Sequence, residues 1–511
     1  MKKFLCFCLV VVMALTMFAC SGNPENPSSE PNSTAAPIEY DSAYAEHVEL
    51  HFVTRGVVSA KADNRVKEII EQKFNCTITW DCLPTTDYTQ ACATIIASGD
   101  YPDMMELWSS DVVGEVTDMY EEGVLWGLND LLTNYGENVI SARPYEGLWY
   151  RQEDGQVAHI QARYNDKTEH TYTIRQDWLD KLGLKYPTTL DELYDVAYAF
   201  TYNDPDGNGL DDTYGLAASP NNDKFWTSPF AIAMGAYGET IGWEKTESGD
   251  WEPWQVRRGT LNAIKWYRKC YQDGLVEPDF MTSTRDMYLE RKNSNRYGIE
   301  YWWTTALSET NAWFSAFTQA VPTQNTQILQ QVTIEGEDSR FPFTTSASNT
   351  GCSLVIFKEC EHPERVMAIL NFLATDEGAD LVVFGPEGEA WDLVDDKIVP
   401  RDLTQEEQLN LGVGAYGIVF QKNMFKRDAS DLVFQSLELN PTYVGPNTNF
   451  PAWDGDSSAL NNYALQELLK MIVEPNIGDL DQYYEQFRAK YMQMGGKEYI
   501  AYMTENLDAV N

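Results

Sequence analysis

One stretch of the sequence carries side chains suited to hold a hard cation. Residues 203–215 read NDPDGNGLDDTYG, in which acidic and amide side chains alternate with glycines. Hard oxygen ligands at this density suit Ca²⁺. Side-chain oxygens and the backbone carbonyl of the leucine give the predicted ligand set: Asp204, Asp206, Asn208, Leu210 and Asp212. The stretch therefore predicts a calcium-binding loop.

The loop departs from the EF-hand pattern. If Asp204 is the first position, the twelfth is Gly215, where an EF-hand requires a bidentate glutamate. All the predicted ligands are local in sequence, and they follow a predicted helix. We therefore expect the calcium ion to have a structural role. The alternative is a solvated turn of aspartates and glycines without a metal ion.

The composition is that of a globular protein with an acidic surface. The chain has 511 residues, of which 43% are hydrophobic and 23% are charged, and its net charge is −41. A field of this sign repels nucleic acid, so we predict no nucleic-acid partner. The 15 tryptophans, 29 tyrosines and 21 phenylalanines are enough to build a surface for ring-shaped ligands as well as a core.

The N-terminus predicts export and a lipid anchor. Lys2 and Lys3 precede an apolar run over residues 4–18, which is shorter than the ~20 residues that span a bilayer. The end of this run resembles a bacterial lipobox, so residues 1–20 are a signal peptide and Cys20 is expected to be lipidated. Residues 21–44 are rich in Pro, Ser and Asn and predict a disordered tether. The expected location is the extracellular face of a bacterial cell membrane. An ordinary secretory signal is the alternative.

Six cysteines remain after the signal and the anchor: Cys76, Cys82, Cys92, Cys270, Cys352 and Cys360. The absence of a CxxC pair and of a histidine cluster argues against a zinc site. Export permits disulfides, and the candidates are Cys76 with Cys82 or Cys92, and Cys352 with Cys360. Buried free thiols are the open alternative.

An alternation of strand and helix patterns predicts an α/β fold. Strand patterns at 48–56, 76–83 and 101–110 alternate with helical patterns at 62–75 and 88–100. This is the order of a doubly wound sheet, in which ligands bind at the carboxyl ends of the strands. The residues at these ends are Arg55, Gly56, Trp108 and Asp111.

A second α/β region is expected from residue 170 onward. Residues 170–200 contain a strand, a helix that ends at Gly183 and a second helix that begins with a capping box of Thr189 and Glu192. Further helices are predicted at 366–383, at 458–474 and at 480–507, the last of them broken at Gly495-Gly496.

Six motifs occur in an order that resembles a known family. They are SGDYPDMMELW, IRQDWLDKLGL, PTTLDELYDVAYAF, DPDGNGLDDTYG, YGIEYWWTT and FLATDEGADLVVFGPEGEAW. Together they resemble the family 1 extracellular solute-binding proteins of bacterial ABC transporters, in particular the oligosaccharide- and alginate-binding branch. The resemblance implies a periplasmic-binding-protein-like fold of two doubly wound α/β lobes joined by hinge strands, with a structural calcium ion in the acidic loop. Lobe one would comprise 45–168 and 320–375, and lobe two 169–319 and 376–511.

The resemblance also implies a function. A lipoprotein of this kind captures an oligosaccharide between its lobes and delivers it to ABC permease subunits, and it is expected to be a monomer. A sugar-stacking tryptophan would be Trp302 or Trp303, further sugar contacts would come from Trp108 and Asp111, and Arg55 matches a polar position. Other candidate ligand residues are Trp226, Trp391, Trp453 and Asp454. For each tryptophan, packing in the core is the alternative.

Two other functions remain as alternatives. In the first, the protein binds a peptide or another polar solute and not an oligosaccharide. Adjacent carboxylates such as Asp211–Asp212 and Asp395–Asp396 admit a secreted glycoside hydrolase in the second, since that chemistry needs two carboxylates at the scissile bond. No GxSxG motif, no P-loop and no GxGxxG after a predicted strand occurs. We therefore predict a binding protein with no catalytic residues.

Overall fold

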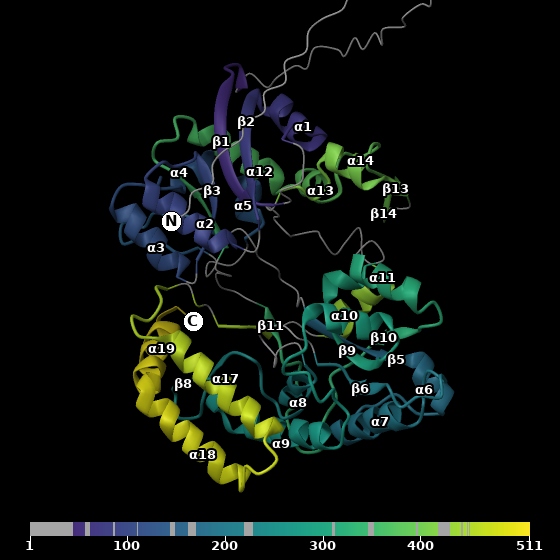
Figure 1. Ribbon diagram of the computed structural model, residues 1–511. Helices are drawn as coiled ribbons and strands as arrows, with labels where there is room; N and C mark the ends of the chain where they lie inside the picture. The colour runs from purple at the N-terminus through teal and green to yellow at the C-terminus, as the bar shows by residue number, and fades with distance from the viewer. Residues whose placement is uncertain are drawn as a thin grey trace, which may run out of the picture.

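The computed structural model describes residues 44–56, 62–84, 87–109, 111–143, 149–161, 170–218, 228–308, 312–345, 352–394, 397–416, 430–440, 443–446, 448 and 450–510. These residues form two halves, each built on its own sheet (Figure 1). The predictions for Cys20 and Trp226 fall outside the described residues.

The first sheet has five strands in the order β2-β1-β3-β12-β4. Its strands are β1 (Val48–Arg55), β2 (Cys76–Leu83), β3 (Met104–Trp108), β4 (Ile160–Gln161) and β12 (Cys352–Ile356). β1 pairs in parallel with β2 and β3, as the alternation of strands and helices predicts. β12 comes from a distant part of the chain and pairs antiparallel with both β3 and β4.

Helices cover both faces of the first sheet. One face packs against α1 (Arg65–Phe74), α4 (Asn129–Tyr135), α5 (Glu137–Ser141) and α12 (Pro363–Leu373), and the other packs against α2 (Tyr88–Ser98) and α3 (Val112–Glu121). Successive side chains of a strand point to opposite faces, so Phe52 lies in the first of these cores and Val53 in the second.

The second sheet has four strands in the order β10-β5-β9-β6. Its strands are β5 (His170–Arg175), β6 (Tyr214–Leu216), β9 (Tyr297–Trp303) and β10 (Thr326–Ile328). β5 runs antiparallel to β9 and β10, whereas β6 runs parallel to β9. The amino end of β5 and the carboxyl end of β9 therefore lie at the same edge of this sheet.

The helices of the second half are α6 (Gln176–Leu182), α7 (Leu190–Tyr202), α8 (Phe230–Ala236), α9 (Arg258–Gln272), α10 (Arg285–Asn293), α11 (Ala312–Ala320), α16 (Asp431–Leu439), α17 (Ser457–Val473), α18 (Leu480–Tyr491) and α19 (Lys497–Val510). The predicted capping box of Thr189 and Glu192 at the start of α7 is confirmed. The predicted break in the last helix is also confirmed, because a π-helical turn over Met492–Gly496 places Gly495 at φ 111°.

One predicted helix is wrong. Residues 366–383 form two helices, α12 and α13 (Asp376–Phe384), because the Thr375 side chain accepts a hydrogen bond from the Gly378 backbone N–H and starts a new helix there. The remaining elements are α14 (Gln405–Leu411) and the short strands β7 (Trp243–Lys245), β8 (Trp251–Pro253), β11 (Thr344–Thr345), β13 (Trp391–Val394), β14 (Lys397–Pro400) and β15 (Tyr443–Val444).

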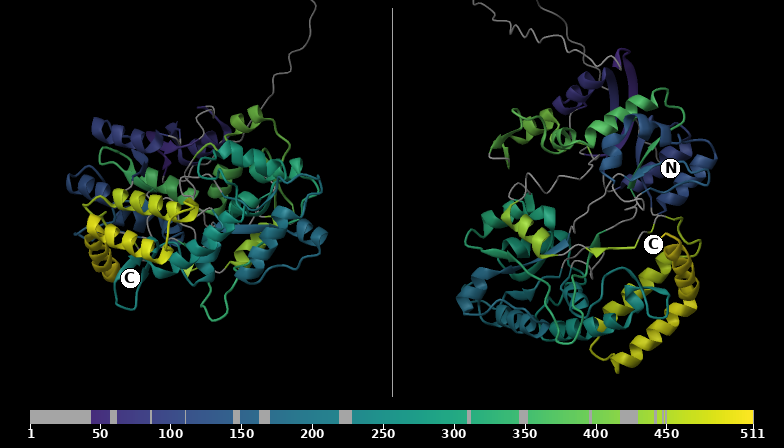
Figure 2. Two further views of the ribbon diagram at one scale, coloured as in Figure 1. Left: turned by 60° about the horizontal axis from the view of Figure 1, so that its bottom comes forward. Right: turned by 180° about the vertical axis from the view of Figure 1, so that it is seen from behind.

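Two segments do not lie in the half that the predicted lobe boundaries give them. β10 pairs in the second sheet although it falls within 320–375. Leu381 and Val382 of α13 pack in the core of the first half although they fall within 376–511. Figures 1 and 2 agree, since α13 and α14 lie beside the first sheet and α17, α18 and α19 lie with the second.

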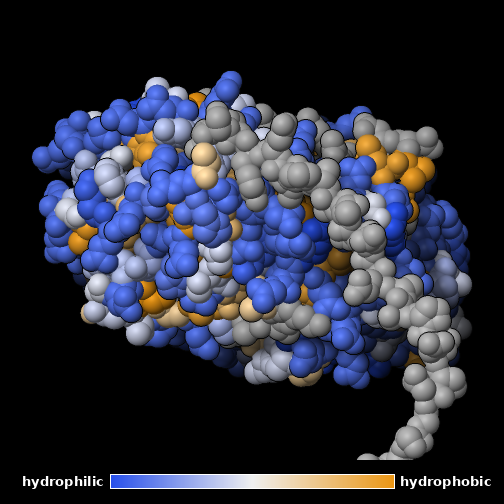
Figure 3. All heavy atoms as spheres, turned by 90° about the horizontal axis from the view of Figure 1, so that it is seen from above, coloured by the Kyte–Doolittle hydropathy of each residue, from blue (hydrophilic) through white to orange (hydrophobic). Residues whose placement is uncertain are grey.

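The six cysteines of the folded part are all free, so the buried-thiol alternative holds for five of them and Cys82 is half-buried. Among the helices that the structure describes, none has the length and apolar character needed to cross a membrane. Seen from above the first half, the surface is largely hydrophilic (Figure 3). This agrees with the net charge of −41.

Candidate functional site

Arg55 and Trp108 meet at the carboxyl edge of the first sheet. β1 ends at Arg55 and β3 ends at Trp108. The guanidinium carbon of Arg55 lies 4.4 Å from the centre of the Trp108 ring, which is the geometry of a cation–π contact. The structure therefore brings together two of the predicted ligand residues, one a planar cation and the other a large aromatic surface.

A buried carboxylate holds this pair in place. Glu106 is fully buried. Its Oε1 accepts hydrogen bonds from Trp108 Nε1 at 3.1 Å and from Cys352 Sγ at 3.2 Å, and its Oε2 accepts one from the Arg55 backbone N–H at 3.0 Å. A buried carboxylate requires such donors. Glu106 thus sets the orientation of the Trp108 ring. We did not predict this role of Glu106, although the sequence shows an acidic residue inside the apolar run PDMMELW.

The electrostatics around Glu106 agree with this geometry. Burial raises the pKa of the Cys352 thiol well above its ordinary value. The thiol therefore stays protonated and is able to donate to Glu106. Cys352 stands opposite Trp108 in the β12–β3 pairing, so the donor comes from the antiparallel strand that no local sequence pattern places there.

Asp111 accepts hydrogen bonds from two separate segments. Its Oδ1 accepts hydrogen bonds from the Gly114 backbone N–H at 3.1 Å and from the Ala452 backbone N–H at 2.9 Å. The first bond caps α3, and the second comes from the segment that precedes α17. Asp111 therefore connects the first half of the molecule to the second.

Trp302 and Trp303 point to opposite faces of β9. Trp302 is 3% exposed and packs among Phe314 and Phe317, with Lys292 Nζ 2.8 Å from the centre of its ring. Trp303 is 36% exposed and ends the strand. The alternation of side chains along a strand produces this difference. Trp303 is accordingly the one with a surface to offer to a ligand.

Trp303 belongs to a group of aromatic side chains at this edge. The ring of His170 lies 5.0 Å from Trp303 and 4.3 Å from Phe343, and its Nδ1 is 2.7 Å from the Tyr301 hydroxyl. Desolvation lowers the pKa of His170 to about 4, so the imidazole is neutral at physiological pH. His170 and Phe343 were not predicted, because they come from segments far from Trp303 in sequence.

The remaining candidate tryptophans lie elsewhere. Trp391 is buried, and its Nε1 donates to the Gly385 carbonyl at 2.8 Å. Trp453 is half-buried and stacks on Tyr499 with 5.0 Å between the ring centres, while Asp454 beside it is exposed. We call Arg55 with Trp108, and Trp303 with its aromatic neighbours, the two edge groups. None of the three residues above belongs to either group.

The acidic loop follows α7 and is closed by its own hydrogen bonds. Asp204 accepts hydrogen bonds from the backbone N–H groups of Gly207 at 2.9 Å and Gly209 at 3.1 Å. The Asn208 side-chain amide donates to Asp206 at 2.9 Å and to Asp212 at 3.1 Å. The side chains of Asp206, Asn208 and Asp212 are thus linked to one another, whereas Asp204 bonds the loop backbone.

Carboxylate and amide oxygens are the ligand type that a hard cation prefers. Burial, followed by the charges of Asp204 and Asp212, raises the pKa of Asp206, and a bound cation relieves such crowding of carboxylates. Within the described residues, no three His, Cys, Asp or Glu side chains are grouped closely enough to hold a metal ion by themselves. Binding would therefore also need the Asn208 amide oxygen and the Leu210 carbonyl.

Comparison with known proteins places the chain in a family. Residues 59–380 match the family model described as bacterial extracellular solute-binding protein. The chain belongs to this family of bacterial extracellular solute-binding proteins. The predicted family membership is confirmed.

Two relatives agree with this assignment. This solute-binding protein is 25% identical over 455 residues to the polygalacturonan/rhamnogalacturonan-binding protein YtcQ of Bacillus subtilis (strain 168), covering 86% of each chain. It is 30% identical over 203 residues to the lipoprotein LipO of the same organism, covering 40% of this chain and 39% of LipO.

The fold also matches solved structures. The alginate-binding protein AlgQ2, solved without calcium ion, superposes with a TM-score of 0.67 at 16% identity over 90% of this chain and 98% of AlgQ2. The two-lobed, periplasmic-binding-protein-like α/β fold that we predicted is confirmed.

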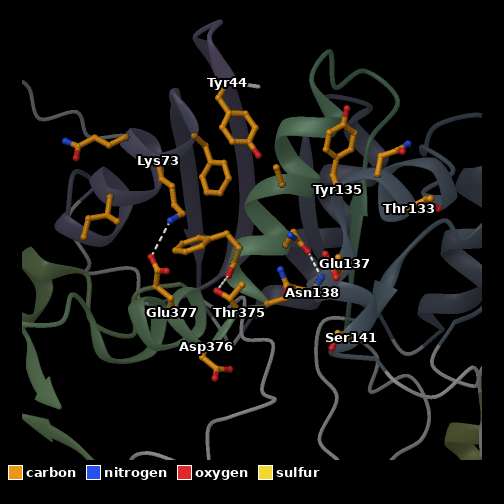
Figure 4. Close-up of a pocket in the computed structure, with 18 residues that line it drawn as sticks. Tyr44, Lys73, Thr133, Tyr135, Glu137, Asn138, Ser141, Thr375, Asp376 and Glu377 are labelled. Atoms are coloured by element: carbon orange, nitrogen blue, oxygen red, sulfur yellow. Dashed lines mark hydrogen bonds and ion pairs between the residues drawn. The ribbon is translucent and has the colours of Figure 1, made fainter. Parts of the chain in front are cut away.

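A large groove of this solute-binding protein lies away from both edge groups. It has a volume of about 1260 Å³ and runs over α1, α4, α5 and α12 (Figure 4). Its polar groups bond one another: Lys73 pairs with Glu377 at 3.4 Å, and the Asn138 backbone N–H donates to Asn371 at 2.7 Å. The groove contains none of the predicted ligand residues, and we do not assign it to the solute.

Proposed function

We propose that this chain is the substrate-binding lipoprotein of an ABC importer and captures an oligosaccharide between its two halves. The observation that carries the proposal is that each of two sheet edges holds a tryptophan beside a polar side chain: Trp108 with Arg55 at the first edge, and Trp303 with His170 at the second. Sugars offer C–H faces to aromatic rings and hydroxyls to polar groups, which suits such edges. The names of YtcQ and AlgQ2 support a saccharide as the solute.

The chain path supports the idea that one ligand contacts both edges. Gln161 ends β4 at the edge that holds Trp108, because β12 pairs Ser353 with Gln161 and Cys352 with Trp108. His170 pairs with Trp303 at the edge of the second sheet. Nine peptide steps join Gln161 to His170. They span at most ~30 Å, which is within reach of an oligosaccharide.

Binding would work by a shift between open and closed arrangements of the halves. A ligand that contacts both edges stabilises the closed arrangement by its differential affinity for it. No covalent step is involved. The sheet-edge groups contain one buried carboxylate, Glu106, which is engaged by three donors. A glycoside hydrolase would need two carboxylates free to act at the glycosidic bond.

The location and the partners follow from the same proposal. A lipid on Cys20 would hold the protein at the extracellular face of the membrane, where it meets the permease subunits as a monomer. The lipoprotein LipO supports an anchor of this kind. Lobe one would contain the first sheet with α12 and α13, and lobe two the second sheet with β10 and the C-terminal helices.

A thermal-shift and calorimetry screen tests the proposal. The chain from Ser21 onward is titrated with neutral and acidic oligosaccharides and with a peptide mixture. We expect a saturable rise in melting temperature with one saccharide class. A rise with peptides and with no saccharide would support the polar-solute alternative. Release of new reducing ends would contradict a pure binding protein.

We also propose that the acidic loop binds a structural calcium ion. Chelator is expected to lower the melting temperature while leaving the saccharide-induced rise intact, because the loop shares no residue with either edge group. Asp206→Asn should abolish the calcium-dependent part of the stability. Asp286→Asn, on α10, is the matched control. Equal melting curves with calcium and with chelator would contradict the calcium assignment.

A further inference from the structure

A second pocket lies in the half that carries the four-stranded sheet. It has a volume of about 400 Å³, which falls within the range of small-molecule sites. Its walls come from the β7–β8 hairpin and the residues after it, from the first turns of α17, and from the region where α18 passes into α19. It shares no residue with the two edge groups.

Aromatic side chains form much of this pocket. Trp254 and Tyr491 line it and are otherwise buried. Tyr499 is held between two tryptophans, with its ring centre 5.1 Å from that of Trp243 at 88° and 5.0 Å from that of Trp453 at 24°. The rings are therefore fixed in place by the fold itself. Preformed aromatic surfaces of this kind need little reordering when a ligand binds.

The polar groups of the pocket are amides and hydroxyls. Gln255 Nε2 donates to Asn461 Oδ1 at 2.9 Å. Gln255 Oε1 is shielded from solvent and has no hydrogen-bond partner among the described residues. Ser457 and Ser458 line the same space from the first turn of α17. The pocket thus offers side-chain amides beside hydroxyl groups that both donate and accept.

The described lining carries no charged side chain, although the chain as a whole has a net charge of −41. A charged ligand group would be desolvated there without an opposite charge to compensate it. A neutral ligand with an apolar face and several hydroxyls has no such cost, and it suits both the rings and the amide and hydroxyl groups of the lining.

We propose that this pocket binds one uncharged sugar unit. The inference goes beyond capture between the halves, because no residue of the pocket takes part in that site. The unit has two sources: the distal end of a chain held at the sheet edges, or a separate saccharide. Both present the same chemistry, and the stoichiometry of binding distinguishes them.

Fluorine NMR of the full chain labelled with 5-fluorotryptophan tests the proposal. Trp243→Phe assigns the resonance of Trp243. The probes are the methyl glycosides of glucose and galactose, with the methyl glycoside of galacturonic acid as the charged counterpart. We expect a saturable shift of the Trp243 resonance with a neutral glycoside and none with the uronide. No shift up to ~100 mM, or an equal shift with the uronide, overturns the proposal.

Matched variants separate this site from the sheet edges. Ser458→Asp adds a charge to the pocket at a helix N-terminus that tolerates an acid, so the fold should persist while glycoside affinity falls at least about tenfold. Trp251→Phe, on the same hairpin but outside the lining, should leave the Trp243 response unchanged.

A variant of the second sheet edge separates the two proposals. Trp303→Ala should weaken oligosaccharide capture while the Trp243 response to methyl glycosides persists. Loss of that response in Trp303→Ala would show that it reports on the sheet edge, and would overturn the inference. A Trp243 shift that saturates with one oligosaccharide per chain identifies a distal sugar unit, and one that needs two identifies a separate saccharide.

Discussion

Trp108 and Trp303 each end a strand of their sheet, yet the molecule holds them in different ways. Trp108 donates a hydrogen bond to a buried carboxylate and lies under a guanidinium. Trp303 is held by ring contacts with His170 and with Tyr301, whose ring centre is 5.9 Å away. Hydrogen bonds to a charged group are directional and strong, whereas ring contacts tolerate small rotations. The first edge should therefore be rigid and the second adaptable.

The largest effect is expected from Trp302, the buried neighbour of Trp303. Trp302→Ala should lower the free energy of unfolding by about 3–5 kcal/mol, because it leaves a cavity among Phe314 and Phe317. Trp303→Ala should lower it by less than ~1 kcal/mol. Urea unfolding of both variants measures the difference. Equal losses would mean that Trp303 is also a core residue.

Glu106→Gln should break the rigidity of the first edge. Glutamine has only one acceptor oxygen, and an NH₂ group takes the place of the other. At least one of the three donors that bond Glu106 would then face this NH₂ group and lose its hydrogen bond. We expect a loss of about 1–3 kcal/mol in the free energy of unfolding. The tryptophan fluorescence should also change in the folded state, and Trp108→Phe should abolish that change.

Glu115→Gln is the control for this experiment, because it makes the same chemical change at an exposed position of α3. Its effect should stay within about 0.5 kcal/mol. If Glu106→Gln unfolded at the same urea concentration as the wild type, Glu106 would have no role in holding Trp108 and Arg55.

Phenylalanine substitutions at the two edges test the comparison through affinity. Alanine at either Trp108 or Trp303 should weaken oligosaccharide binding by about 2 kcal/mol, or ~30-fold. Trp303→Phe should retain most of the affinity, since ring contacts survive, whereas Trp108→Phe should lose more because it deletes the bond to Glu106. Calorimetry measures these values, and Tyr198→Ala on α7 serves as a control. A greater loss for Trp303→Phe would reverse the comparison.

The two halves also differ in how they hold a neutral histidine. Desolvation lowers the pKa of both His159 and His170 to about 4, from an ordinary value of 6.5. His159 is 1% exposed beside Tyr150, and neither of its ring nitrogens has a partner among the described residues. His170 instead meets the Tyr301 hydroxyl.

Acid should destabilise the fold through these histidines. The unfolded chain binds more protons than the folded one between the two pKa values, so the free energy of unfolding falls as the pH drops from about 6.5 towards 4. The slope should be about 1.4 kcal/mol per pH unit for His159. His159→Phe should remove that contribution in urea unfolding followed across this range. An unchanged slope would mean that His159 is protonated in the folded protein.

Local patterns predicted much of the first half. β1, α1, β2, α2 and β3 all occur within a few residues of their predicted bounds, because period and capping are properties of neighbouring residues. Prediction failed at residues 366–383, where the pattern of two helices in succession resembles that of one. The cap at Thr375 was the signal that separates them.

The candidate site was predicted in part. Arg55 and Trp108 were placed at the correct edge, since strand ends can be read from the sequence. The spacing of Trp302 and Trp303 showed that they face opposite ways, but not which one is buried. Only the packing of α11 and α16 against one face of β9 decides that.

The sequence by itself determined the order of strands and helices in the first half, the presence of an acidic loop after α7 and the presence of aromatic side chains at strand ends. Each of these depends on residues close together in the chain. The tertiary structure alone decided that Cys352 and Glu106 support Trp108, that Phe343 and His170 join Trp303, and that all six cysteines of the folded part are free. These outcomes depend on pairings between distant segments, such as β12 with β3, which no local pattern encodes.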